Sequence, residues 1–202
     1  VTSVVAQNID INIFCADGVK PLRILGRDAD IVNNRVSTRL NQVYSQQEKY
    51  LLLEVQVPEG KNQQRRQIAS VDVSYTDIIN NENHRAKDDL WVSYSRSEKA
   101  VRSAYDKATL GEAVKQRANY LSKEAVQLRD AGRVQAARKK LEQASMLIQE
   151  EAEQYDLSSE AFAPAAAAYE EDAARVEDEA SWNKNRKGLR EKQYKLESQQ
   201  RK

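Results

Sequence analysis

The sequence predicts an α+β protein in which an N-terminal antiparallel β-sandwich is followed by a C-terminal antiparallel α-helical hairpin or bundle of about three helices. Two observations support this class. Segments within residues 1–95 alternate apolar and polar side chains, which is the period of a half-buried strand. From residue 96 onward alanine, glutamate, lysine and arginine dominate, and apolar residues recur at helical spacing. We therefore expect a sandwich over residues 1–95, a helical region over 96–182 and a basic C-terminal tail over 183–202.

The first part is expected to be built around a strand over residues 49–58, in which Leu51, Leu53 and Val55 share one face. Residues 80–89 are hydrophilic and are interpreted as a loop. About six or seven short strands with turns between them and no helices favour a sandwich. Alternation places the remaining strands at residues 4–16, 21–25, 36–40, 69–76 and 90–94.

In the helical region, a long helix is expected to begin at a capping box formed by Thr109 and Glu112, whose side chains each satisfy a free backbone amide. One narrow apolar stripe precedes Gly132 and a second follows it. Glycine suits a helix end because it adopts positive φ without strain. Two long helices joined by so short a turn pack antiparallel, so the sequence predicts an αα-hairpin over about residues 109–155.

A third helix is expected at about residues 159–181, with Pro164 in its first turn. Residues 95–108 fit two interpretations, and both stay open. Ser95 and Glu98 have the spacing of a helix cap, whereas the same segment could also extend the last strand.

Composition limits the possible functions. The chain has 202 residues, enough for one or two domains, and 31% of them are charged. The net charge of +1 gives no overall field that would steer the chain to nucleic acid or to a membrane surface. With one cysteine, Cys15, the chain cannot form an internal disulfide or a thiolate metal site. No apolar run approaches the roughly 20 residues that cross a bilayer, so no membrane span is expected.

One pattern resembles a metal-binding loop. Asp72, Ser74 and Thr76 fit Asp-x-Ser-x-Thr. Oxygen ligands must converge on the ion from a loop, whereas these three residues alternate with apolar ones along a predicted strand. We therefore expect an ordinary polar strand face here and no metal site.

Other polar residues also lack the arrangement that chemistry requires. Asp28, Asp30 and Asn33 do not have the spacing of an EF-hand loop, and a turn with side-chain caps is expected instead. His84 is placed in a surface loop without a serine–acid partner, and Cys15 is interpreted as a small semi-buried residue. No catalytic, cofactor-binding or metal-ligating residue is assigned, and the chain is expected not to be an enzyme.

Charge is patterned only near the C-terminus. Residues 170–179 are acidic, while residues 184–202 are basic with Tyr194 among them and Trp182 just before them. Such a stretch could bind nucleic acid, but no nucleic-acid-binding fold accompanies it. The other interpretation is a solvated helix whose charges pair with each other or with the helix dipole.

Several short motifs occur together: Ser3-Val-Val-Ala-Gln-Asn8, Gly18-Val19, Ile24-Leu-Gly26, Tyr50-Leu-Leu-Leu-Glu54 and Val57-Pro58. They resemble the segment that follows the last helix of the von Willebrand factor type A (VWA) domain in bacterial VWA proteins. The turn Leu128-Arg-Asp-Ala-Gly-Arg133, with Ala136-Ala137 and Leu141, is similar to the helical region beyond it. The resemblance implies a β-sandwich followed by helices, accompanying a metal-binding VWA head. That head, with its Asp-x-Ser-x-Ser loop, lies outside these residues.

The leading hypothesis is a non-catalytic protein-interaction or scaffold region that has a protein partner, no small-molecule substrate and no cofactor. The alternative is a nucleic-acid-binding module that acts through the basic tail. A third hypothesis is an unrecognised hydrolase, for which the sequence offers no local nucleophile–base motif. The chain opens on Val1 rather than methionine, which indicates a fragment or a processed product and leaves the compartment unassigned. The resemblance alone favours an extracytoplasmic location, either periplasmic or at the cell surface.

Overall fold

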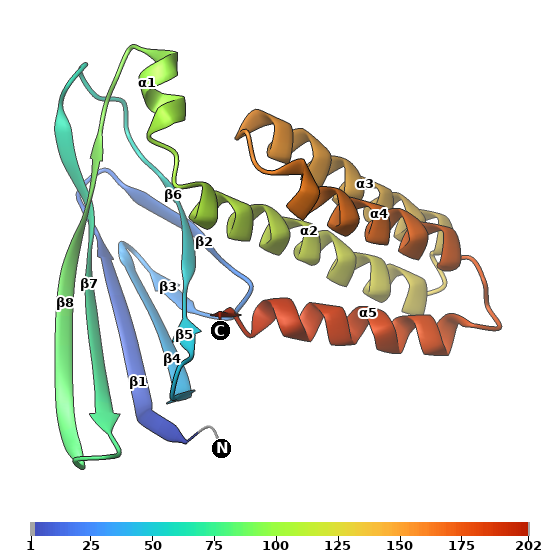
Figure 1. The fold of residues 1–202 in the computed structure, drawn as a ribbon, viewed down its shortest axis with the longest axis horizontal. Coiled ribbons are helices and arrows are strands. Elements are labelled where there is room, and N and C mark those ends of the chain that lie inside the picture. The colour runs from blue at the N-terminus through green and yellow to red at the C-terminus, as the bar shows by residue number, and fades with distance from the viewer. Residues whose placement is uncertain (1–2, 202) are drawn as a thin grey trace. The chain divides into compact units, whose positions relative to one another are not determined.

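The structure is a computed structural model that describes residues 3–201 (Figure 1). The chain forms two compact units. A sheet unit contains the described residues up to Val101 together with Gln200–Arg201, and a helical unit contains Arg102–Gln199. Antiparallel sheets in the first unit and packed helices in the second confirm the predicted α+β class.

The sheet unit is built on a five-stranded antiparallel sheet (Figure 1). In order across the sheet, the strands are β3 (Asp30–Val32), β4 (Arg35–Tyr44), β1 (Val4–Cys15), β7 (Arg65–Asp77) and β8 (Glu82–Ser93). In the central strand β1, Ile13 is opposite Val36 on one side and Val71 on the other. The preceding residue, Asn12, is opposite Ser37. Because successive side chains point to opposite faces, the sheet has one apolar face and one polar face.

A second, two-stranded sheet covers the apolar face. It consists of β2 (Lys20–Leu25) and β6 (Leu52–Gln56), which are also antiparallel. Ile24 and Leu53 of this sheet pack against a buried cluster of Ile13, Val36 and Ala69 from the larger sheet. Burial of these side chains removes apolar surface from water and joins the two layers.

The segment at residues 49–58 is therefore not the centre of the fold, which corrects the sequence prediction. Its strand β6 pairs with β2 only, and its apolar side chains cover the larger sheet. Just before it, β5 (Glu48–Lys49) forms a third small sheet with β9 (Gln200–Arg201). The central strand is β1, which pairs with β4 on one side and β7 on the other.

Strand β8 occupies a segment that the sequence predicts as a loop. Residues 80–89 are hydrophilic, yet the structure pairs β8 with β7 along its whole length. As an edge strand that is exposed at nearly every residue, β8 has no apolar alternation over residues 82–89, and only its end falls within the strand predicted at residues 90–94. Pairs of opposite charge stabilise it across the ladder instead: Asp72 accepts a hydrogen bond from Arg85 Nε at 2.7 Å and lies 3.5 Å from Lys87 Nζ.

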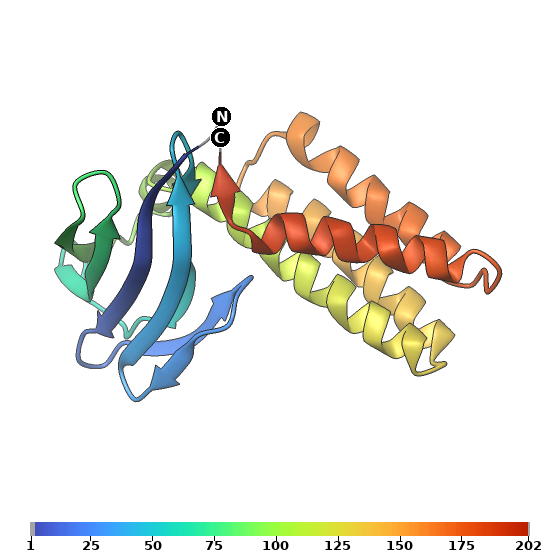
Figure 2. The same ribbon diagram turned by 90° about the horizontal axis from the view of Figure 1, so that it is seen from below.

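The helical unit contains four long helices that lie alongside one another (Figure 2). They are α2 (Lys107–Asp130), α3 (Val134–Gln154), α4 (Ser159–Arg175) and α5 (Trp182–Glu197). The turn between α2 and α3 contains Gly132 at a φ of 76°, the conformation expected for this glycine. The two helices therefore pack as the antiparallel hairpin that the fold class includes.

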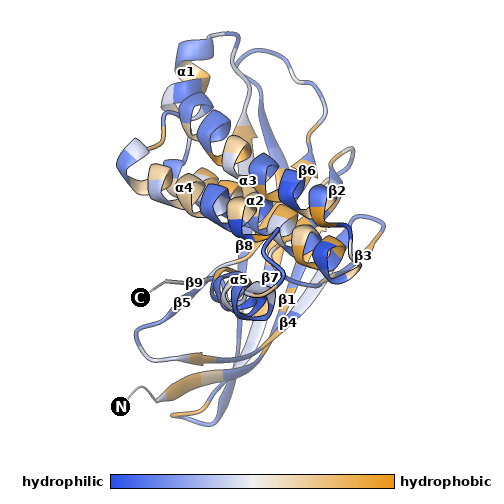
Figure 3. Ribbon diagram, turned by 90° about the vertical axis from the view of Figure 1, so that its right-hand side faces the viewer, coloured by the Kyte–Doolittle hydropathy of each residue, from blue (hydrophilic) through white to orange (hydrophobic). Residues whose placement is uncertain are grey.

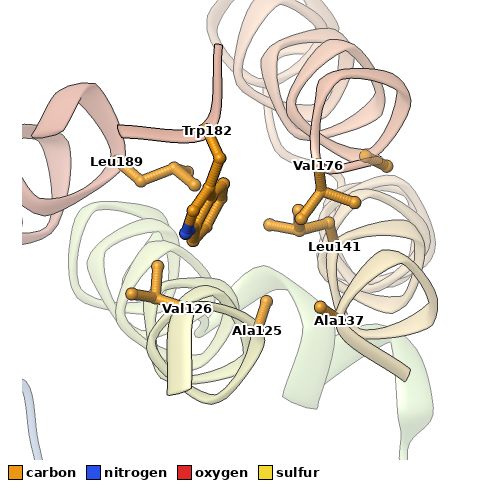
Figure 4. Packing of buried hydrophobic residues seen from close by; sticks show 8 residues of the cluster. Ala125, Val126, Ala137, Leu141, Val176, Trp182 and Leu189 are labelled. Atoms are coloured by element: carbon orange, nitrogen blue, oxygen red, sulfur yellow. The ribbon is translucent and has the colours of Figure 1, made fainter. Parts of the chain in front are cut away.

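Two apolar clusters form the core of the helical unit. The first surrounds the fully buried Leu141 of α3 (Figure 4). Its members come from all four long helices or their ends: Ala125, Val126, Ala137, Leu141, Ala173, Val176, Trp182 and Leu189. The second cluster includes Val114, Ile148 and Phe162. There Gly111 permits close approach of the helices, because a Cβ at this position would lie 2.9 Å from the Phe162 ring.

The helix starts differ in detail from the sequence predictions. The N-cap of α2 is Asp106, whose carboxylate accepts from the backbone amides of Ala108 and Thr109, so the capping box at Thr109 does not form. Upstream, a short helix α1 (Glu98–Ser103) occupies part of the ambiguous segment. Pro164 lies inside α4 rather than in its first turn, where it removes one intrahelical hydrogen bond.

The predicted basic tail forms α5 in the structure. Although the helix is largely hydrophilic (Figure 3), its side chains Trp182 and Leu189 are buried. Trp182 Nε1 donates to Asp130 Oδ1 at 3.1 Å, and Gln193 Nε2 donates to Ser122 Oγ at 2.9 Å. These contacts fix α5 against α2. Within the described residues, no helix combines the length and apolar character needed to cross a membrane.

Replacement of Leu141 tests the hairpin core. Leu141→Ala should lower the free energy of unfolding by about 2–5 kcal/mol, because it loses buried apolar contacts and leaves a cavity. The control Lys139→Ala, on the exposed side of α3, should change it by less than about 0.5 kcal/mol. Urea melts followed by helical circular dichroism compare the two. Equal effects would mean that this stripe is not a packing seam.

Candidate interaction surface

The polar face of the five-stranded sheet carries a band of charged side chains and two exposed aromatic residues. We call it the outer face. Pairing across the strands places these residues on it: Asp10, Asn12, Phe14, Arg35, Ser37, Arg39, Ser70, Asp72, Ser74, Arg85, Lys87, Asp89 and Trp91. The small sheet packs on the opposite face, around Ile13, Val36 and Ala69.

Ion pairs and hydrogen bonds hold the charged side chains of the outer face in place. Arg39 Nε lies 2.7 Å from Asp10 Oδ1, and Arg35 Nη2 donates to Asn12 Oδ1 at 2.7 Å. On the other side of β1, Asp72 is bound by both nitrogens of the Arg85 fork. A side chain held in this way loses little further conformational entropy when a partner binds.

The electrostatics of Asp72 follow from these contacts. Hydrogen bonding from Arg85 lowers the pKa of the Asp72 carboxyl group, and the positive charges of Arg85 and Lys87 act in the same direction. Partial desolvation opposes this effect but is smaller than the Arg85 hydrogen bond. Asp72 is therefore ionised and paired with two cations of its own sheet, Arg85 and Lys87.

Two aromatic side chains interrupt this polar surface. Phe14 is 45% exposed and Trp91 is 46% exposed. Each carries an arginine over its ring: Arg35 Cζ lies 5.5 Å from the Phe14 centroid, and Arg65 Cζ lies 4.7 Å from the Trp91 centroid. Exposed aromatic and arginine side chains are the residue types that contribute most to protein–protein binding.

A surface hollow of about 590 Å³ lies between the two rings. Polar residues of β7 and β8 form its floor. Asp89 Oδ1 accepts hydrogen bonds from Gln67 Nε2 at 2.9 Å and from Ser70 Oγ at 2.7 Å. The hollow thus combines two apolar walls with fixed hydrogen-bonding groups, an arrangement that suits a protruding side chain of a partner.

The Asp-x-Ser-x-Thr residues lie on one face of β7, as the alternation predicts. Asp72 is paired with Arg85, and Thr76 Oγ1 donates to Asn83 Oδ1 at 3.0 Å. The three side chains thus follow one another along the strand and do not converge. Among the described residues, no group of three or more His, Cys, Asp or Glu is arranged to hold a metal ion.

The other sequence candidates are separated in the structure. Asn33 forms the turn between β3 and β4 with a φ of 53°, and the backbone oxygen of Asp28 accepts from Thr38. Cys15 is buried, and desolvation raises the pKa of its thiol. His84 lies in β8 rather than in a loop, because that segment pairs with β7, and its ring stacks on Tyr75 at 5.4 Å.

The basic residues of α5 are largely paired with carboxylates. Asp130 receives two of them, with Arg186 Nη1 at 3.2 Å and Arg190 Nη2 at 3.3 Å. Lys192 Nζ lies 2.8 Å from Asp172. These pairs reduce the positive charge that the nucleic-acid alternative would use.

Phe14 and Trp91 of the outer face are not among the candidate site residues predicted from the sequence. The sequence does contain an indication for Phe14: in an alternating strand it occupies the next position after Asp10 and Asn12 on the polar face. An aromatic residue at a position that should face water is a departure from the pattern. Trp91, between Leu90 and Val92 of the strand predicted at residues 90–94, gives the same kind of signal.

Comparisons with known proteins support the fold. No family model and no curated protein matches the sequence. The crystal structure of the ArnB paralog VWA2 from Sulfolobus acidocaldarius is similar, with a TM-score of 0.50 and 14% identity over 96% of this chain. A von Willebrand factor type A protein from Catenulispora acidiphila gives a TM-score of 0.49 and 12% identity over 77% of this chain. The matches cover 42% and 38% of those two chains, so this chain spans less than half of either. The fold of this chain thus resembles part of VWA2.

Asp72 predicts a pH dependence of stability. A carboxyl group whose pKa is lowered on folding contributes stability above its unfolded pKa, and this contribution is lost as the pH falls through the folded pKa. The loss of stability caused by Asp72→Asn should therefore be full at pH 7 and should shrink below about pH 4. Urea midpoints measured across this range test it. Glu59→Gln, which removes an exposed carboxylate from a loop, is the control.

Metal binding gives a second test of this strand. Calorimetric titration with Mg²⁺ or Ca²⁺ should show no binding at micromolar concentrations, because Asp72 is neutralised by Arg85 and Lys87. Micromolar binding that disappears in Asp72→Ala would contradict the assignment of a polar strand face.

Proposed function

We propose that this chain is a non-catalytic protein-interaction region that accompanies a metal-dependent VWA head located outside these residues. The observation that carries the proposal is the outer face, where Phe14 and Trp91 stand exposed within a network of fixed charges. Rigid aromatic residues surrounded by polar groups are typical of binding surfaces.

The similarity to VWA2 supports the part of the proposal that concerns a head. The matching region covers nearly all of this chain but less than half of VWA2, so that protein has substantial structure beyond the region that matches. The motifs at residues 3–8 and 50–54 resemble a segment that follows a VWA domain, which suggests that a head lies on the N-terminal side.

The placement of reactive side chains supports a non-catalytic role. Cys15 of β1 is opposite Ala69 of β7, whereas His84 of β8 is opposite Tyr75 of β7. About 20 Å of β7 separates Ala69 from Tyr75, so Cys15 and His84 are far apart along the sheet. A thiol and an imidazole must come within hydrogen-bond reach to act as nucleophile and base. The buried, protonated thiol of Cys15 is also a poor nucleophile.

The proposal predicts the content of the reading frame on the N-terminal side of Val1. It should encode a VWA head with an Asp-x-Ser-x-Ser loop, and that head, produced separately, should bind this chain in calorimetry. A frame without such a loop would contradict the companion role, as would a head that shows no binding.

Phe14→Ala should weaken binding of the head about tenfold or more, since an exposed aromatic anchor is lost from the outer face. The matched control is Tyr194→Ala, which removes an aromatic side chain that is 74% exposed on α5. It should leave the affinity unchanged within about twofold. Equal affinities for wild type and Phe14→Ala would mean that the head binds elsewhere.

A further inference from the structure

Strand β8 is an open edge of the five-stranded sheet. It pairs with β7 on one side, and no strand of the described chain follows it in the sheet order. It has 12 residues, nearly all exposed. Leu90 and Trp91, which point to opposite faces, are 45% and 46% exposed. A long edge with unpaired backbone groups and half-exposed apolar side chains is a template for another strand.

Charge is segregated along this edge. The basic residues Arg85 and Lys87 precede the acidic residues Asp88 and Asp89. A second β8 laid antiparallel would bring the acidic half of one copy against the basic half of the other. The edge is therefore complementary to itself.

We propose that two copies of this chain associate through β8, paired antiparallel about a two-fold axis at Asp88, so that their sheets become continuous. An axis perpendicular to the sheet keeps both outer faces on the same side, so outer-face residues must oppose outer-face residues. With Asp88 opposite its own copy, Lys87 is opposite Asp89 of the second copy. Arg85 is then opposite Trp91 of the second copy, and symmetry makes each pair twice.

This register also covers the exposed apolar residues. On the inner face Ala86 opposes Leu90 of the second copy, and on the outer face the aliphatic stem of Arg85, whose guanidinium is bound to Asp72, packs beside the Trp91 ring. If the axis passed through Lys87 instead, Lys87 would lie opposite Lys87 of the second copy. It would also leave Leu90 facing the polar His84.

The charges involved are already positioned in the single chain. Lys87 Nζ lies 3.5 Å from Asp72, and Asp89 is held by Gln67 and Ser70. One contact is unfavourable, because Asp88 meets its own copy at the axis. Association through this edge is therefore reversible and sensitive to single charges.

The test is sedimentation equilibrium of the 202-residue chain over a range of concentrations. The wild type should form a concentration-dependent dimer, and Lys87→Glu should raise its dissociation constant about tenfold, since two attractive pairs become repulsive. Asp88→Asn should lower it about threefold by removing the repulsion at the axis. Lys139→Glu, a charge reversal on the exposed side of α3, should leave it within about twofold of wild type.

A mixing experiment separates pairing from loss of folding. Asp89→Lys should also weaken self-association about tenfold, but an equal mixture with Lys87→Glu should recover near-wild-type affinity, because both cross-strand pairs become attractive again. Circular dichroism verifies that each variant retains its sheet. A wild-type chain that stays monomeric up to about 1 mM would overturn the proposal. So would a dimer unaffected by Lys87→Glu, or a mixture that does not associate.

This proposal does not rest on the function proposed above. The two surfaces share Trp91, which the dimer covers, whereas Phe14 on the central strand β1 lies away from the edge, so Phe14→Ala tests head binding alone. A chain that stays monomeric would still be free to bind the head, and Phe14→Ala should weaken head binding without changing the dissociation constant of the dimer.

Discussion

The sheet unit depends on β1 being paired on both sides at once. Ile13 is held between Val36 and Val71, and the buried cluster at this level needs all three strands in register. A slip of one residue would turn Ile13 outward and Asn12 inward, so the apolar core fixes the register strongly. The same register places Phe14 and its neighbours on the other face. The geometry of the outer face is thus determined by the packing behind it.

The helical unit combines two kinds of interface. Toward α3 and α4, α2 presents apolar residues such as Val114, which is fully buried. Toward α5 it presents buried polar residues: Gln116 Nε2 donates to the backbone oxygen of Leu196 at 2.7 Å, and Ser122 accepts from Gln193. Apolar packing supplies most of the stabilisation, while buried hydrogen bonds tolerate little displacement. The position of α5 along α2 is therefore specified by polar contacts more than by its two large apolar residues.

The sequence alone predicts those elements whose pattern reflects burial. In β1 and β7 one face is covered, so apolar and polar residues alternate and the strands are recognisable. β8 has neither face covered, and its hydrophilic residues 82–89 carry the signature of a loop even though the backbone ladder is complete. α5 is hydrophilic because it docks through ion pairs and hydrogen bonds, which leave little periodicity. The exposed pair Phe14 and Trp91 becomes visible as a surface only once the register brings β1, β7 and β8 together.

The third sheet has a consequence for the connection between the two units. The chain leaves the sheet unit after Val101 through a covalent link, and it returns at the end of the helical unit through β9. That return is held by two residue pairs, Glu48 with Arg201 and Lys49 with Gln200. In the sequence, the helical unit is therefore inserted between two parts of the sheet unit. So short a ladder has few hydrogen bonds to break, so β9 should open more readily than the long ladders of the five-stranded sheet.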